Sequence, residues 1–271
     1  MLGKLLKYEF KSTSRLLGFV YAALLVIAVV LGLLLRGNLY GIVGYYNTPG
    51  MQETAIIIFI LIYMLIVTAV IVITTFTNIE RFYRNMLKGE GYLMHTLPVP
   101  TWMHVAAKTI SALVYTVLSV CALIVSVFLL LIASNVPWIY IHEWLTDEFI
   151  PSLRENGISV ALTAIILLVS LIRVILLFYV SMSIGAAAKK NKLAFSVLAF
   201  IAICIVMAII SAIFLSDLIA GNTSVFFVSD SGASLFYSTA EMIRQLVVDL
   251  IYSAIFFAGC TFFLGKKLNL E

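Results

Sequence analysis

Charged residues are scarce in this chain of 271 residues. Only 11% of its residues are Asp, Glu, Lys or Arg, and 63% are hydrophobic, whereas a soluble domain is about one quarter charged and about half apolar. This deficit argues against an ordinary soluble domain, a disordered chain and a nucleic-acid-binding protein. The three cysteines, Cys121, Cys204 and Cys260, each lie within an apolar run. We therefore expect small buried side chains there, rather than disulfides or a metal cluster.

Motifs for catalysis are also missing from the sequence. No G-x-x-x-x-G-K-[ST] phosphate loop occurs, although ATP hydrolysis commonly depends on one. The three histidines, His95, His104 and His142, are dispersed and do not have the spacing of a zinc site. We expect this chain to contribute no catalytic residue and to bind no metal or cofactor itself. No cleavable signal peptide is expected either, because the first apolar run ends at Arg36 without a cleavage site.

Six apolar runs are long enough to cross a membrane as helices, since a bilayer core of ~30 Å takes about 20 residues. The runs are continuous rather than alternating, which argues against a β-barrel. We therefore predict an all-α polytopic membrane protein whose transmembrane domain covers 16–271. The predicted spans are 16–35, 55–76, 109–134, 158–188, 193–215 and 246–265.

The cations outside the predicted spans are unevenly distributed. Thirteen Lys and Arg residues fall on the side that holds both termini, whereas three, Arg36, Arg154 and Arg244, fall on the other side. Positively charged segments remain in the cytoplasm, so we expect both termini to be cytoplasmic. The segments 135–157 and 216–245 would then be the two larger outer loops.

The first fifteen residues have the pattern of an amphipathic helix. At helical spacing, Leu2, Leu6 and Phe10 lie on an apolar face, and Lys4, Lys7 and Lys11 lie on a basic face. We predict that 1–15 forms a short helix of its own, which lies in the cytoplasmic membrane interface and binds anionic headgroups. The alternative is that these residues extend the first span as one helix.

The cytoplasmic segment 78–108 is long for a loop and rich in apolar residues. Basic residues at helical spacing from Arg81 onward predict that the second span continues as a helix beyond the membrane, until Gly89 and Gly91 interrupt it. A helix can restart near Pro100 and run into the third span. Large side chains between these points form an apolar knob, which either packs on the helix ends or docks a partner. The knob consists of Tyr92, Leu93, Met94, Leu97 and Trp102.

Four short stretches resemble a known family of membrane proteins. They are Arg81-Phe82-Tyr83-Arg84-Asn85-Met86, Glu90-Gly91-Tyr92-Leu93, Leu97-Pro98-Val99-Pro100 with Lys108 after it, and Leu6-Lys7-Tyr8-Glu9-Phe10-Lys11. These stretches look like the permeases of type-2 ABC transporters, and most like the small permeases common in Gram-positive bacteria. The layout of the whole chain is also similar to that family.

The resemblance implies a coupling helix within 90–102 that docks on a separate ATP-hydrolysing subunit, where ATP and Mg²⁺ bind. It also implies a second permease copy and a place in a bacterial cell membrane. We expect an exporter of an amphipathic peptide or lipid-like cargo, because the spans contain few charges and no outer loop is large enough for a receptor domain. A secondary transporter or channel-like protein without an ATPase is the first alternative, and a non-transporting membrane scaffold or enzyme is the second. The implied docking residues are Glu90, Tyr92, Leu93, Met94, Leu97 and Trp102.

Two formal charges lie inside the predicted spans, Arg173 in the fourth and Asp249 in the sixth. A charge at bilayer depth costs at least ~3 kcal/mol unless it is paired or hydrated. Together with Ser170, one turn before Arg173, these residues line a translocation path or a helix–helix contact; otherwise each charge snorkels to the interface. A stripe of polar residues on the third span predicts close helix packing, and contact with a substrate is the alternative. The stripe consists of Ser111, Tyr115, Ser119 and Ser126.

Overall fold

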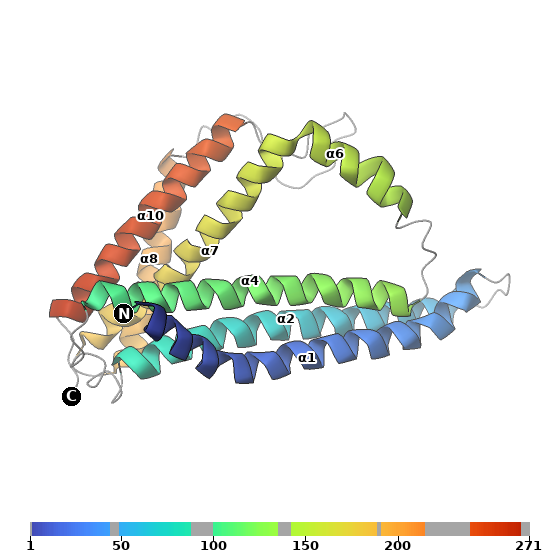
Figure 1. Cartoon of the computed structure of the whole chain (residues 1–271), viewed down its shortest axis with the longest axis horizontal. Helices are drawn as coiled ribbons and strands as arrows, with labels where there is room; N and C mark the ends of the chain where they lie inside the picture. Colours follow the sequence, from blue (N-terminus) through green and yellow to red (C-terminus); the bar gives the residue numbers. More distant parts are fainter. Residues whose placement is uncertain are drawn as a thin grey trace. The chain divides into compact units, whose positions relative to one another are not determined.

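The computed structural model describes residues 2–43, 49–87, 100–134, 142–188, 191–214 and 239–266. These residues are nearly all helical, and they include no strand, which confirms the predicted all-α class. The elements are α1 (Leu2–Val43), α2 (Pro49–Leu87), α4 (Thr101–Ala133), the π-helix η1 (Trp144–Phe149), α6 (Ile150–Glu155), α7 (Gly157–Ala186), α8 (Lys192–Phe214) and α10 (Thr239–Lys266) (Figure 1).

Six of these helices contain stretches that are long and apolar enough to cross a membrane. The stretches are Thr13–Arg36, Ile57–Leu87, Thr101–Ala133, Gly157–Ala186, Lys192–Ile210 and Glu241–Gly265. Each overlaps one of the six predicted spans, so the chain is a multi-pass membrane protein. The predicted extensions are also present, since α2 continues to Leu87 and α4 begins at Thr101. The Pro100 carbonyl accepts a hydrogen bond from the Met103 N–H (3.0 Å), which closes the first turn of α4.

The prediction of a separate helix over 1–15 is wrong. These residues form the beginning of α1, which runs without interruption from Leu2 to Val43. No proline occurs in this stretch to end a helix before the first span. The Thr13 hydroxyl donates to the Glu9 carbonyl (2.9 Å), a contact that often bends helices. Figure 1 shows that α1 changes direction near its beginning.

The two predicted outer loops are partly helical. Within 135–157, the described residues form η1 and α6 rather than an irregular loop. Within 216–245, the structure describes only the last part, where α10 already begins at Thr239. The final helix is therefore longer than the predicted sixth span.

The chain forms two compact units. The first comprises Met1–Arg81 and Ile110–Asn156, and the second comprises Phe82–Thr109 and Gly157–Glu271. Both α2 and α4 contribute to each unit, because each of these helices continues across the boundary. Consecutive residues of α2, Arg81 and Phe82, therefore belong to different units.

Hydrogen bonds between helices hold the first unit together, in which α1, α2 and α4 run side by side (Figure 1). The Tyr115 hydroxyl donates to the Phe10 carbonyl (2.7 Å), and the Tyr21 hydroxyl donates to the Tyr115 carbonyl (3.0 Å). The hydroxyls of Tyr63 and Ser126 share a hydrogen bond (2.8 Å). All four residues of the predicted polar stripe on the third span are buried. The prediction that this stripe serves helix packing is therefore confirmed.

The beginning of α1 is tied to the end of the α2 segment in the first unit. Arg81 Nη1 lies 4.0 Å from Glu9 Oε2 and 3.5 Å from the Glu9 carbonyl oxygen. The same guanidinium also donates to the hydroxyl of Thr13, which is buried. The part of α1 around Glu9 and Thr13 therefore contacts α2, while Lys7 and Lys11 beside it are exposed.

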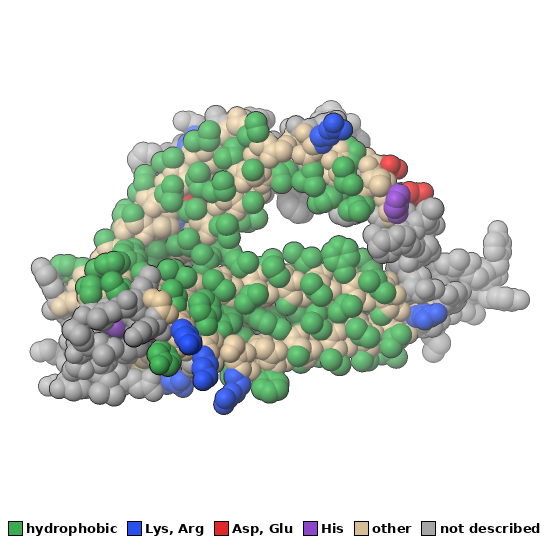
Figure 2. Space-filling view, in the orientation of Figure 1, with side chains coloured by type: hydrophobic (Ala, Val, Ile, Leu, Met, Phe, Trp, Pro, Cys, Tyr) green, Lys and Arg blue, Asp and Glu red, His purple; other side chains and the backbone are tan. Residues whose placement is uncertain are grey.

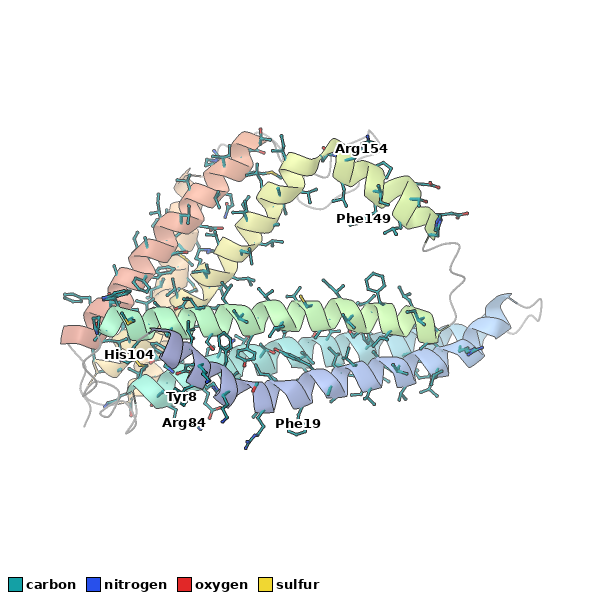
Figure 3. The ribbon with its side chains drawn as sticks, in the orientation of Figure 1. Tyr8, Phe19, Arg84, His104, Phe149 and Arg154 are labelled. Atoms are coloured by element: carbon teal, nitrogen blue, oxygen red, sulfur yellow. The ribbon has the colours of Figure 1, made fainter. Side chains whose placement is uncertain are left out.

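Charges of opposite sign gather on different elements of the first unit. Figure 2 shows Lys and Arg side chains over the beginning of α1, and Asp and Glu side chains over η1. Lys7, Lys11 and Arg15 are exposed on α1, as is Asp147 on η1. Phe19, which is 75% exposed, points away from α2 and α4 (Figure 3). This side chain suits contact with lipid.

Candidate functional site

The second unit is built around α7, which packs against both α8 and α10. Two contacts define the register of α7 and α10: Arg173 meets Asp249, and the Ser183 hydroxyl lies 3.3 Å from Cys260 Sγ. The residue numbers rise together on the two helices, so α7 and α10 run parallel. Between α7 and α8 the chain turns at Asn191, whose φ of 53° is a left-handed conformation that asparagine tolerates.

Arg173 and Asp249 form an ion pair between α7 and α10, a pairing that the sequence does not predict. Arg173 Nε lies 2.9 Å from Asp249 Oδ1, and the side chains are 25% and 2% exposed, respectively. Gln245, one turn before Asp249, donates from Nε2 to the same Oδ1 (3.2 Å). The burial of Asp249 is incompatible with snorkelling and favours the predicted helix–helix contact. Gln245 was missed, although its i, i+4 spacing from Asp249 was a usable signal.

Hydrogen bonding of the ion pair is incomplete. Among the described residues, neither Arg173 Nε nor Asp249 Oδ2 has a hydrogen-bond partner of good geometry. The Ser170 hydroxyl donates instead to the Leu167 carbonyl of its own helix (2.8 Å). Ser170 therefore shares a helix face with Arg173 but does not complete the pair. Buried polar atoms of this kind call for a physical explanation.

The ion pair lies at mid-depth of a long helix. At a rise of 1.5 Å per residue, Arg173 is about 24 Å from Gly157 and about 20 Å from Ala186 along α7. Pairing lowers the cost of placing charge there. Removal of one partner from a buried pair costs about 3–5 kcal/mol, because it leaves an uncompensated charge.

Burial along α7 changes abruptly at the ion pair. Between Gly157 and Val174, every described residue is half-buried or exposed, including Ile158, Leu167 and Leu168. The buried residues of α7 all follow the pair: Ile175, Leu176, Leu177, Tyr179, Val180, Ser181, Ser183, Gly185 and Ala186. Arg173 therefore marks the boundary between a half of α7 with many buried residues and a half whose described residues are at most half-buried.

Most of the predicted docking residues lie outside the described residues. These are Glu90, Tyr92, Leu93, Met94 and Leu97. Trp102 is described, and it occupies the second position of α4 with half of its surface exposed (50%). An indole so placed is available to a partner or to lipid.

Each flank of the predicted docking segment contains buried residues. Before it, Phe82 is fully buried and stacks on Tyr179 of α7, with ring centroids 4.0 Å apart and planes 9° from parallel. After it, His104 (labelled in Figure 3) and Val105 are buried in the first turns of α4. The stack with Tyr179 was not predicted, because no local pattern links two aromatic residues so far apart in sequence.

The cysteines differ in their surroundings. All three are free thiols; Cys260 is buried, Cys204 is half-buried and Cys121 is exposed. The expectation of buried side chains is thus confirmed for Cys260 and wrong for Cys121, because a membrane-spanning helix can present apolar residues to lipid. The described residues include no cluster of His, Cys, Asp and Glu that could hold a metal ion.

No protein-family model, no curated protein and no solved structure matches this chain. The six apolar helices, the ion pair between α7 and α10 and the buried residues beside the predicted docking segment are therefore the observations that bear on function.

Proposed function

We propose that this chain is the membrane-spanning permease subunit of an ABC transporter, driven by ATP hydrolysis on a separate ATPase subunit. Three features support the proposal: the six apolar helices, the resemblance within 81–108, and the absence of a phosphate loop in the chain's own sequence. In this proposal ATP and Mg²⁺ bind to the partner, and the permease contributes no catalytic residue.

One observation carries the proposal: Trp102 is exposed, while residues on both flanks of the predicted docking segment are buried. Binding energy at interfaces concentrates in a few large side chains, and tryptophan is prominent among them. Trp102 is half exposed, whereas Phe82 and Val105 on the two flanks of the segment are fully buried. A displacement of the segment by an ATPase would therefore act on packed residues, and through the Phe82–Tyr179 stack it would act on α7.

The remaining parts of the proposal follow from the resemblance and the composition. The protein would sit in a bacterial cell membrane with both termini in the cytoplasm, paired with a second permease copy of the same or a related sequence. Its cargo would be an amphipathic peptide or lipid-like molecule, and the direction would be export. Few charges line the described spans, which supports an amphipathic rather than a highly charged cargo.

A pull-down of the ATPase with tagged permease tests the docking segment. Trp102→Ala and the double change Tyr92→Ala with Leu93→Ala should each release the ATPase. Glu90→Ala should have a smaller effect, since an exposed ion pair contributes only about 0.2–1 kcal/mol. Phe19→Ala is the matched control, because it removes an exposed aromatic side chain from the first unit. It should leave ATPase binding unchanged.

A thermal melt of each detergent-extracted variant accompanies the pull-down. Trp102 and Phe19 are both exposed, so truncation of either should shift the melting temperature little. Full ATPase binding by the Tyr92→Ala, Leu93→Ala double variant would show that this segment is not the docking site.

The ion pair favours a second candidate, a secondary transporter or channel-like protein that works without an ATPase. Ionisable residues inside a membrane protein often mark an ion or substrate pathway, and Arg173 and Asp249 meet at mid-depth. The two candidates differ in their energy source. Transport by the reconstituted chain alone, driven by an ion gradient without ATP, would support this second candidate.

A further inference from the structure

The Arg173–Asp249 pair has hydrogen-bonding capacity that the described protein does not use. Asp249 is almost completely buried, yet its Oδ2 has no hydrogen-bond partner among the described residues, and Arg173 Nε lies 2.9 Å from Oδ1 without hydrogen-bond geometry. Leaving such buried atoms unsatisfied costs about 1–3 kcal/mol each, and more for charged groups. A group that supplies one donor and one acceptor would satisfy both atoms.

Lipid chains cannot supply those hydrogen bonds, whereas a hydroxyl group can. A water molecule donates to a carboxylate oxygen and accepts from a guanidinium N–H, and it is stable in a buried site that offers two to four polar partners. The Arg173 side chain is also 25% exposed. A partly exposed guanidinium at mid-depth is far less costly against water than against hydrocarbon.

Ser170 gives the site its direction along α7. It lies on the same helix face as Arg173, one turn closer to Gly157, and its side chain is half-buried. Beyond the pair, burial begins with Ile175, whereas no described residue from Gly157 to Val174 is buried. The polar groups of Ser170, Arg173 and Asp249 thus lie together where the buried part of α7 begins.

We propose that the Arg173–Asp249 pair is the closed end of a water-binding site that extends along α7 toward Ser170. Ser170 lines this site, and the packed half of α7 from Ile175 onward seals it. The site binds water because the pair offers an unused donor and an unused acceptor in one place. It does not depend on the proposed transport function, since the unused donor and acceptor belong to the ion pair itself.

Thiol reactivity at single positions of α7 tests the site. The background is the full chain with Cys121, Cys204 and Cys260 replaced, reconstituted in phospholipid vesicles. Ser170→Cys introduces a thiol about 20 Å along α7 from Gly157, a depth at which a lipid-facing thiol is out of reach of an impermeant reagent. A charged methanethiosulfonate is the probe, added to each side of the membrane in turn.

Two further positions serve as controls. Leu168→Cys lies at nearly the same depth on the opposite face of α7, and Leu168 is exposed in the structure. Ser181→Cys lies beyond the pair, where Ser181 is buried. Because the thiolate is the reactive species and hydrocarbon keeps thiols protonated, Ser170→Cys should react at least about tenfold faster than either control. A Ser170→Cys thiol that reacts no faster than Leu168→Cys overturns the proposal.

A second arm removes the pair. Arg173→Met combined with Asp249→Leu replaces the polar atoms with apolar ones, so the rate at Ser170→Cys should fall to that at Leu168→Cys. An unchanged rate would show that the pair does not hold the water, which would also overturn the proposal. The first arm decides independently if this double variant does not fold.

Discussion

Removing one member of the Arg173–Asp249 pair leaves the other charge among apolar helices without its counter-ion. The informative set is Arg173→Met, Asp249→Leu and the double variant, because these side chains are apolar and similar in size to the originals. The two single variants should not be equivalent. Asp249 is held inside with its side chain 2% exposed, whereas Arg173 is 25% exposed and long enough to turn outward.

The magnitudes follow from this difference in burial. Arg173→Met leaves a buried carboxylate without its counter-ion. We therefore expect the free energy of unfolding to fall by nearly the full ~3–5 kcal/mol that breaking a buried pair costs. Asp249→Leu should cost less, because the guanidinium can snorkel. The double variant should be close to the native protein or more stable, since apolar replacement of a buried pair is often neutral or stabilising by about 1–4 kcal/mol. The two changes should therefore be strongly non-additive.

Unfolding of the purified chain by SDS, followed by circular dichroism, measures these differences. Chemical cross-linking at native conditions checks that all variants keep the same oligomeric state. If Arg173→Met is as stable as the native protein, Arg173 does not pair with Asp249 and snorkels instead. If the losses of the two single variants simply add in the double variant, the two side chains do not interact.

Two further predictions concern the packing at two glycines and the orientation of the chain in the membrane. Gly185→Ala should destabilise the chain by about 1–3 kcal/mol, because a Cβ there would collide with Ser196 Oγ and lie 2.5 Å from its backbone nitrogen. Gly18→Ala, whose Cβ would meet nothing within 4 Å, should stabilise α1 by about 1 kcal/mol, and thermal melts compare the two. In a cysteine-free background on intact cells, an impermeant thiol reagent should label Asp147→Cys but not Tyr8→Cys. The reverse labelling would overturn the orientation inferred from the cation count.

The helices themselves could be predicted because the bilayer imposes one dominant requirement. A run of about 20 apolar residues crosses as a helix since its backbone groups must be satisfied internally. The extensions of α2 and α4 were also visible, from basic residues after the second span and from Pro100. The separate helix over 1–15 was mispredicted because tertiary contacts decide it: Arg81 and Tyr115 hold the first turns of α1 from other helices.

The sequence indicated the charged residues of the candidate site but not the contact between them. Arg173 and Asp249 stood out individually, because any charge inside an apolar run is unusual. Their pairing depends on the parallel register of α7 and α10, which no local pattern encodes. The Phe82–Tyr179 stack and the abrupt change of burial at Arg173 have the same origin. Each results from packing between segments that are distant along the chain.

Purification of the tagged chain from its own cells under mild detergent most directly tests whether it works with an ATPase. The expected result is a stable complex in which the chain is accompanied by a second polypeptide that contains a G-x-x-x-x-G-K-[ST] phosphate loop, and whose binding is lost in the Tyr92→Ala, Leu93→Ala variant. The contradictory result is a chain that purifies without any nucleotide-binding partner and, once reconstituted alone, moves a solute in response to an ion gradient.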